Sequence, residues 1–228
     1  MIDFNVAIIL DALPYLWQGL QYTLMLTASS IVGGIVLGTI LALMRLSPFR
    51  IVCWISAGYV NLIRSIPLVL VLFWFFFLMP FVFQWILHTP DPVAVGPNQT
   101  AFITFIMFEA AYFSEIIRAG IQSVSKGQFA AAQALGMGSA QTMWHVILPQ
   151  AFRNMVPLLL TQSIILFQDT SLVYVLSATD FVGAAGKIAR RDSTLVEMYI
   201  FVAISYLVLC VVFSYLVRRL HQKIKIIR

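Results

Sequence analysis

The stretch SKGQFAAAQALGMGSAQTMWHVILP, residues 125–149, is a nearly uncharged insert between two long apolar runs, and the other segments are arranged around it. Ser125 and Gln128 form a capping-box pattern, in which the Ser hydroxyl and the Gln amide satisfy unpaired backbone groups at a helix start. The alanine-rich helix that follows is predicted to stop at Gly136, because glycine adopts a left-handed backbone without steric cost. The first half of the insert therefore predicts one short helix.

The second half of the insert predicts another short helix, capped by Ser139. Its apolar residues recur at the spacing of one helix face: Ala140, Met143, Trp144, Ile147 and Leu148. Pro149 and Pro157 each remove a backbone donor and crowd the carbonyl four residues earlier, so a kink or break is expected just after the insert. Two short helices with an apolar face fit a groove of another protein, and a loop lying on lipid headgroups accounts for the pattern equally well.

The composition excludes an ordinary soluble domain. Of the 228 residues, 61% are hydrophobic and 10% are charged, whereas soluble proteins carry about 25% charged residues. The net charge of +5 does not indicate nucleic-acid binding, because the cations lie at the ends of apolar runs and in the C-terminal tail. Cys53 and Cys210 show neither a disulfide framework nor metal-ligand spacing.

Several apolar runs reach the roughly 20 residues that a helix needs to cross a membrane. They predict an all-α membrane protein with five transmembrane helices, in runs at about residues 15–44, 51–87, 100–124, 152–176 and 195–217. The second run is too long for one straight crossing and is expected to break at residues 61–67 into a short interfacial helix and a span. Ser30, Gly34 and Gly38 share one face of the first run, where small residues let another helix approach closely.

The distribution of cations predicts which ends face the cytoplasm. The positive-inside rule assigns nine cations to the inside: Arg45, Arg50, Lys126, Arg153, Arg218, Arg219, Lys223, Lys225 and Arg228. Three others in a segment assigned outside oppose this orientation, but they are fewer: Lys187, Arg190 and Arg191. Residues 1–14 are thus expected in the periplasm, 15–217 in the transmembrane domain, and the basic tail 218–228 at the cytoplasmic face, against anionic lipids.

Ionisable residues inside the apolar runs are costly and indicate functional or paired sites. Glu115 and Arg118 are three residues apart and can pair on one helix face. Glu109, farther from the cytoplasmic end, either lines a transport path or ties two helices together. Arg64 either snorkels to lipid phosphates or holds a charge in the bundle interior.

The fourth run is the most polar of the five. A set of its residues recurs at the spacing of one helix face: Gln162, Ile165, Leu166 and Asp169. This face is a candidate lining of a translocation path, and hydrogen bonding between helices explains it equally well. The candidate path residues are Arg64, Glu109, Gln162 and Asp169.

The insert also resembles the EAA loop of ABC-importer permeases, through Ala130-Ala131-Ala132, Gly136 and Val146-Ile147-Leu148-Pro149. In that family the loop docks on a cytoplasmic ATPase subunit and passes its motion to the membrane helices. Ala130 stands where the family has a Glu, so this chain lacks the carboxylate for a salt bridge there. The resemblance implies ten coupling residues: Ala130, Ala131, Ala132, Leu135, Gly136, Met143, Trp144, Ile147, Leu148 and Pro149.

Further stretches resemble the glutamate/aspartate importer permeases of the polar amino acid family, at residues 64–72, 108–123 and 158–162. The resemblance covers about residues 19–215 and implies a type I, MetI-like ABC permease bundle in the bacterial inner membrane. The implied partners are a periplasmic binding protein, a second homologous permease or a second copy of this chain, and an ATPase dimer. ATP and Mg²⁺ would be bound by that ATPase, and no cofactor is implied for this chain.

These 228 residues contain no Walker A sequence and no nucleophile with a plausible His partner. The sequence therefore predicts a non-catalytic permease subunit, served by a separate ATPase; a channel or secondary transporter, which needs no ATPase, is the alternative from another class. The cations assigned outside can concentrate acidic substrates, and docking to a binding protein explains these cations equally well. They and the amide of Gln162 agree with glutamate or aspartate as substrate, whereas Glu109 and Asp169 do not. Glutamine or another polar amino acid stays open.

Overall fold

The computed structural model describes residues 6–224, and every regular element in that range is a helix. The helices are α1 (Val6–Arg45), α2 (Arg50–Arg64), α3 (Leu68–Leu87), α4 (Pro97–Gln122), α5 (Lys126–Ala134), α6 (Ser139–Thr142), the π-helical turn η1 (Met143–Ile147), α7 (Leu148–Asp169), the 3₁₀ helix η2 (Thr170–Leu176), α8 (Phe181–Arg191) and α9 (Leu195–Ile224). The outermost parts of the predicted terminal segments, residues 1–5 and 225–228, lie outside the described residues.

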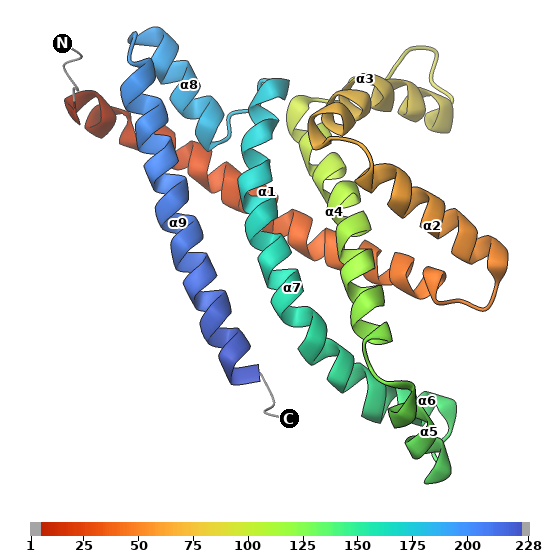
Figure 1. Cartoon of the computed structure of the whole chain (residues 1–228). Coiled ribbons are helices and arrows are strands. Elements are labelled where there is room, and N and C mark those ends of the chain that lie inside the picture. The colour runs from red at the N-terminus through yellow and green to blue at the C-terminus, as the bar shows by residue number, and fades with distance from the viewer. Residues whose placement is uncertain (1–5, 225–228) are drawn as a thin grey trace.

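Five helical stretches are long and apolar enough to cross a membrane, which confirms the predicted number. They are Ala7–Arg45, Leu68–Leu87, Pro97–Gln122, Ser139–Leu176 and Leu195–Gln222. Helix α1 begins earlier than predicted, because the apolar residues before Tyr15 continue the helix. Its 40 residues span about 60 Å, twice the hydrocarbon thickness, and Figure 1 shows it crossing the other helices obliquely.

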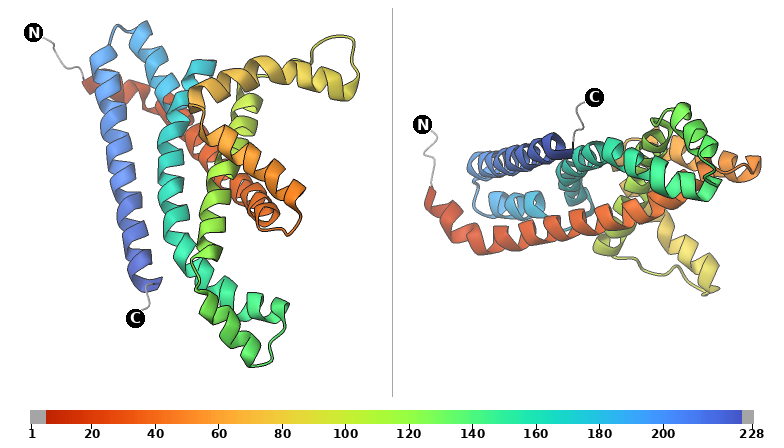
Figure 2. Two further views of the ribbon diagram at one scale, coloured as in Figure 1. Left: turned by 45° about the vertical axis from the view of Figure 1, so that its right-hand side comes forward. Right: turned by 90° about the horizontal axis from the view of Figure 1, so that it is seen from below.

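The predicted break in the second run is confirmed. Helix α2 ends at Arg64, and Pro67 has φ −58° and ψ 135°, immediately before α3 begins. Proline fixes its own φ and disfavours a helical conformation in the residue before it, so the chain changes direction here. Beyond its first two turns, where its buried residues lie, α3 projects away from the other helices (Figure 2).

Helices α1 and α4 form the most extensive helix pair in the described structure. The small residues of α1 explain this, as predicted. A Cβ added at Gly34 would lie 3.0 Å from Cβ of Glu109 and from the ring of Phe113, and one at Gly38 would lie 3.0 Å from the carbonyl oxygen of Ala110. The close approach places Glu109 of α4 directly against α1.

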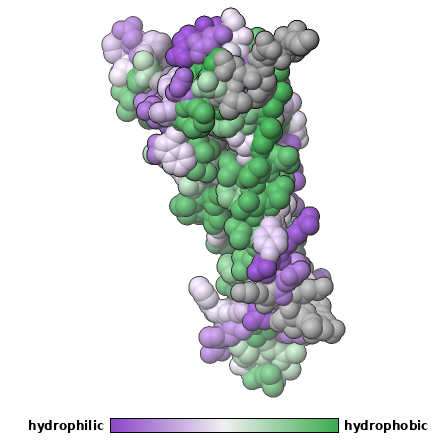
Figure 3. All heavy atoms as spheres, turned by 90° about the vertical axis from the view of Figure 1, so that its left-hand side faces the viewer, coloured by the Kyte–Doolittle hydropathy of each residue, from purple (hydrophilic) through white to green (hydrophobic). Residues whose placement is uncertain are grey.

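The molecule has two distinct ends. Helix α8 and the start of α1 lie at one end, whereas α5, α6 and the end of α9 lie at the other (Figure 1). Hydrophobic residues fill the middle of the face in Figure 3, and hydrophilic residues gather at both ends. This distribution fits a protein that crosses a bilayer along its long direction.

The insert forms two short helices, as predicted, but its caps differ from the prediction. Ser125 precedes α5 without making a side-chain capping bond, and Gly138, not Ser139, precedes α6. The backbone N–H of Gly138 donates to Oε1 of Gln141 at 3.1 Å. Gly136 has φ 80°, so the predicted left-handed stop after α5 is confirmed.

Of the kink or break predicted just after the insert, no break occurs. The chain is helical without interruption from Ser139 to Leu176. The turn η1 lies just before Pro149, and there the N–H of Leu148 donates to the carbonyl of Met143, five residues earlier. The wider π turn accommodates the missing donor of Pro149, so the helix continues. The same turn interrupts the regular spacing of the predicted apolar face.

Candidate functional site

The tip formed by α5, α6 and η1 exposes large apolar side chains. Leu135 is 83% exposed, Trp144 is 71% exposed and Met143 is 37% exposed. Of the other predicted coupling residues, Ala130, Ala131, Gly136 and Pro149 are exposed, Leu148 is half-buried, and Ala132 and Ile147 are buried. The apolar insert thus has an inner side, which holds α5 against η1, and an outer side that the described chain leaves uncovered.

The tip is fastened to the membrane helices by hydrogen bonds and close packing. Nε2 of Gln150 donates to the carbonyl of Val146 at 2.9 Å, and Nδ2 of Asn154 in α7 donates to Oγ of Ser123, just after α4, at 2.8 Å. A Cβ at Gly120 of α4 would come within 2.8 Å of Met155 of α7. The base of the tip is therefore joined to both α4 and α7.

Glu109 is fully buried in α4 and faces α7. Nε2 of Gln162 lies 3.3 Å from both carboxylate oxygens of Glu109, and Asp169 is within electrostatic range of the same carboxylate. Three of the four predicted path residues are thereby brought together. The residues of the predicted lining face of α7 do not share one environment, because Leu166 is buried and Ile165 is exposed.

The fourth predicted path residue, Arg64, belongs to a neighbouring ionic cluster. Glu115 pairs with Arg118, as predicted, and also with Arg45 of α1. Nη1 of Arg64 lies 3.9 Å from Oε2 of Glu115, with its side chain 38% exposed. Three guanidinium groups therefore meet one carboxylate, which leaves a net charge of two positive units within the cluster.

Tyr112 connects the two groups of charges. The guanidinium carbon of Arg64 lies 5.3 Å from the centre of its ring, and Tyr112 is also within electrostatic range of Glu109 and Asp169. Tyr112 was not among the path residues predicted from the sequence, although it lies three residues after Glu109 and so on the same face of the helix. The result is a polar track along α4, defined by Glu109, Tyr112 and Glu115 with their partners.

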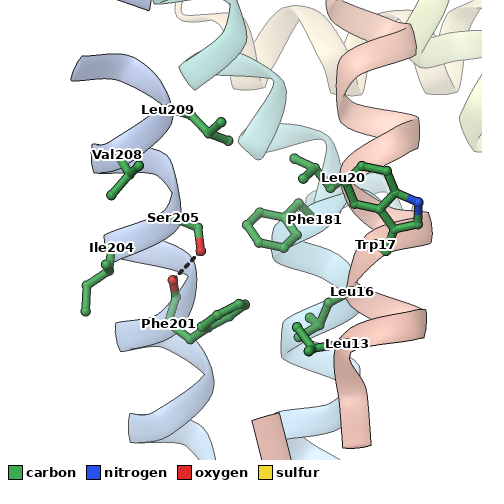
Figure 4. A pocket seen from close by; sticks show the side chains of 10 residues that line it. All are labelled: Leu13, Leu16, Trp17, Leu20, Phe181, Phe201, Ile204, Ser205, Val208 and Leu209. Atoms are coloured by element: carbon green, nitrogen blue, oxygen red, sulfur yellow. Dashed lines mark hydrogen bonds between the residues drawn. The ribbon is translucent and has the colours of Figure 1, made fainter. Parts of the chain in front are cut away.

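Two grooves on the opposite side of the molecule are apolar, unlike the polar track. The larger one, between α1 and α9, encloses about 350 Å³. Its lining is drawn in Figure 4: Leu13, Leu16, Trp17, Leu20, Phe181, Phe201, Ile204, Ser205, Val208 and Leu209. The hydroxyl of Ser205 already donates to the carbonyl of Phe201 at 2.8 Å, and the indole of Trp17 is the other polar side chain of the lining, so this groove is almost wholly apolar and suits hydrocarbon.

No metal site is found within residues 6–224, where no three His, Cys, Asp or Glu side chains are grouped closely enough to hold an ion. Cys53 and Cys210 are free thiols. The polar track offers charges and hydrogen-bonding groups, and the tip offers apolar contacts.

Comparisons with known proteins agree with this picture. Residues 34–226 match the family model of the binding-protein-dependent transport system inner membrane component. The chain is 51% identical to the glutamate/aspartate import permease protein GltK of Escherichia coli O6:H1, over 98% of this chain and 99% of that protein. It is 34% identical to the probable glutamine ABC transporter permease protein GlnM of Bacillus subtilis, over 97% of this chain and 98% of that protein.

Solved structures show the same fold. An amino acid ABC transporter crystallised with histidines superposes with a TM-score of 0.88, at 30% identity, over 98% of this chain and 99% of that one. The inward-facing methionine transporter MetNI superposes with a TM-score of 0.75, at 20% identity, over 93% of this chain and 97% of that one, and supports the fold alone. The chain therefore belongs to the family of binding-protein-dependent transport system inner membrane components.

Proposed function

We propose that this chain is the permease subunit of an ATP-driven importer that carries glutamate or aspartate across the bacterial inner membrane. The name of its 51% identical relative supports that substrate class. The glutamine permeases at 34% and 30% identity keep glutamine as the alternative substrate. In this proposal ATP and Mg²⁺ bind to a separate ATPase dimer, and no cofactor binds to this chain.

The observation that carries the proposal is the continuous helix from Ser139 to Leu176. It joins the exposed apolar tip to the polar track, because Trp144 and Gln162 lie on it 18 positions apart, or about 27 Å at 1.5 Å per residue. An unbroken helix transmits displacement along its length far better than a loop does. Movement of the tip is therefore expected to move Gln162 and Asp169 relative to Glu109 of α4.

The tip provides the docking surface for the ATPase in this mechanism. Leu135, Met143 and Trp144 supply an exposed apolar surface of the kind that fills a groove on a partner protein. When the two ATPase subunits close on ATP, the tip is pulled with them, and α7 tilts against α4. The polar track then opens alternately to the outside and to the inside, between this chain and a second permease subunit or a second copy of it.

The polar track has the charges that a zwitterionic amino acid needs. Arg64 is partly exposed and lies 3.9 Å from Glu115, so its charge is available to a substrate carboxylate. Glu109 and Asp169 can attract the α-ammonium group, which is the role their negative charge has in this proposal. The two carboxylates that seemed to oppose an acidic substrate are therefore compatible with one.

Uptake into vesicles tests the function. The full transporter is reconstituted with ATP inside, and its purified binding protein and labelled glutamate are added outside, with unlabelled aspartate and glutamine as competitors. We expect ATP-dependent uptake that excess aspartate suppresses and excess glutamine does not. Suppression by glutamine alone would replace the substrate, and uptake driven by an ion gradient without ATP would contradict the importer mechanism.

A further inference from the structure

A second polar pocket lies at the opposite end of the molecule from the tip, outside the polar track. It encloses about 270 Å³ between η2, α8 and the start of α9. Its polar lining comes from Tyr174, Ser177, Lys187, Arg190 and Tyr199. In Figure 1, α8 lies at the far end from α5 and α6, so an ATPase docked on the tip leaves this pocket on the outer side of the membrane.

The fold builds one wall of this pocket from a single face of α8. Gly183, Gly186, Lys187 and Arg190 recur at the spacing of one helix face. A Cβ at Gly183 would lie 2.6 Å from the carbonyl of Ala178, so only glycine fits there. The buried carboxylate of Asp180 fixes the start of α8 by accepting the backbone N–H groups of Val182 at 3.1 Å and Gly183 at 2.9 Å.

Two cations line the pocket, and neither forms a salt bridge within residues 6–224, although the buried carboxylate of Asp180 is within electrostatic range of Lys187. Nζ of Lys187 donates to Oγ1 of Thr179 at 2.5 Å, and Arg190 forms no ion pair with any residue in the described range 6–224. A Cβ at Gly186 would lie 3.3 Å from the hydroxyl of Tyr199 and 3.9 Å from Nη2 of Arg190, so both groups stand over this glycine. The pocket therefore offers positive charge, hydroxyl donors and room for one side chain.

We propose that this pocket receives a carboxylate side chain of the periplasmic binding protein when that protein docks on the permease. The lining contains no Asp or Glu, so nothing there would pair with the ammonium group of a free amino acid. A protein carboxylate has no such group and matches the two cations. The inference rests on the proposed function, since it needs an importer that is served by a binding protein.

Charge removal tests the inference in the full transporter, reconstituted in nanodiscs of neutral phosphatidylcholine. The variants Lys187→Gln and Arg190→Gln are compared with Arg191→Gln, a matched control whose cation already pairs with Asp192 at 2.7 Å. We expect each pocket variant to weaken binding of the loaded binding protein about tenfold, and the control to change it less than about twofold. Wild-type affinity in both pocket variants would overturn the inference.

The same binding measurement distinguishes failure of this inference from failure of the proposed importer function. If the wild-type transporter binds the binding protein and the pocket variants bind it equally well, this inference alone fails. If the wild-type transporter binds no binding protein, the proposed importer function fails with it. Anionic lipid is added in a further arm: a loss of lipid retention in the pocket variants, with unchanged protein binding, would assign the pocket to a headgroup and also overturn the inference.

Carbodiimide cross-linking gives a direct readout of contact. The reagent joins a carboxylate of the docked protein to the Lys187 amine as an amide, with net loss of water. Lys187 is the only lysine between Lys126 and Lys223, so a cross-linked peptide identifies the pocket. We expect the cross-link in wild type and its loss in Lys187→Arg, which keeps the charge and the binding. Absence of the wild-type cross-link in a complex that does bind would contradict the proposed contact.

Discussion

The tip and the polar track are joined by the continuous helix Ser139–Leu176, which carries Trp144 of the tip and Gln162 of the track, and both regions reverse the usual distribution of side chains. The tip exposes Leu135 and Trp144, whereas the track buries Glu109. Both arrangements are costly unless another molecule completes them. We propose that this chain separates two tasks: apolar contact with a partner at one end, and recognition by charge within the membrane, with one helix between them.

The largest effect is expected where the track is most highly charged. Glu115→Gln removes the one carboxylate that pairs with Arg45 and Arg118, and it leaves the guanidinium groups to repel one another. Loss of one member of a buried ion cluster costs about 3 kcal/mol, and less here because the groups are partly exposed. A thermal-unfolding scan in detergent should show a clear decrease in Tm, and Arg191→Gln should show none. An unchanged Tm would mean that the cluster is not structural.

The next prediction distinguishes a loss of coupling between the tip and the ATPase from a loss of folding. Gly136 has φ 80° with open space around it, so Gly136→Leu forces a non-glycine residue into a left-handed conformation that costs about 1–2 kcal/mol. We expect loss of substrate-stimulated ATPase activity with normal membrane insertion. Gly127→Ala, which meets only Ser125 at 3.8 Å, is the control. Full coupling in the leucine variant would count heavily against the tip's role.

A third prediction concerns the exposed apolar surface of the tip and its contact with the ATPase. Trp144→Ala removes an exposed ring from the tip, and Trp85→Ala removes one from α3 that is similarly exposed. Truncation of an aromatic side chain at the centre of an interface typically costs about 2 kcal/mol or more. Co-purification of the ATPase with the membrane subunits should fall in the first variant and persist in the second. Equal retention in both would show that the ATPase does not contact Trp144.

The smallest effect is expected at the outer end, and it depends on pH. Burial raises the pKa of Asp180 from its usual value of 3.8 to about 6, against the opposing effect of its backbone hydrogen bonds. The folded state therefore binds this proton more tightly than the unfolded state, and local stability falls as the pH rises from about 4 to about 6. Protection factors of the α8 amides, which are exchange rates corrected for the intrinsic pH dependence of exchange, should be larger at pH 4 than at pH 7, and Asp180→Asn should remove most of the difference.

Much of the fold could be predicted from the sequence. Apolar run length gave the five spans, and Pro67 marked the break between α2 and α3, because both signals are local. The pairing of Arg45 with Glu115 joins residues 70 positions apart, and no local pattern indicates which cation of a basic turn reaches which helix. The turn η1 was missed for a related reason: Pro149 predicts strain, but only the packing of α5 against η1 shows how the helix accommodates it.

The proposed mechanism depends on an ATPase that binds the tip on the cytoplasmic side. A photo-activated cross-linking amino acid placed at position 135 of the assembled transporter would capture this contact, with the same amino acid at position 193 near α8 as the control. We expect a nucleotide-dependent cross-link to the ATPase from position 135 and none from position 193. No cross-link from position 135, or one to the binding protein, would contradict it.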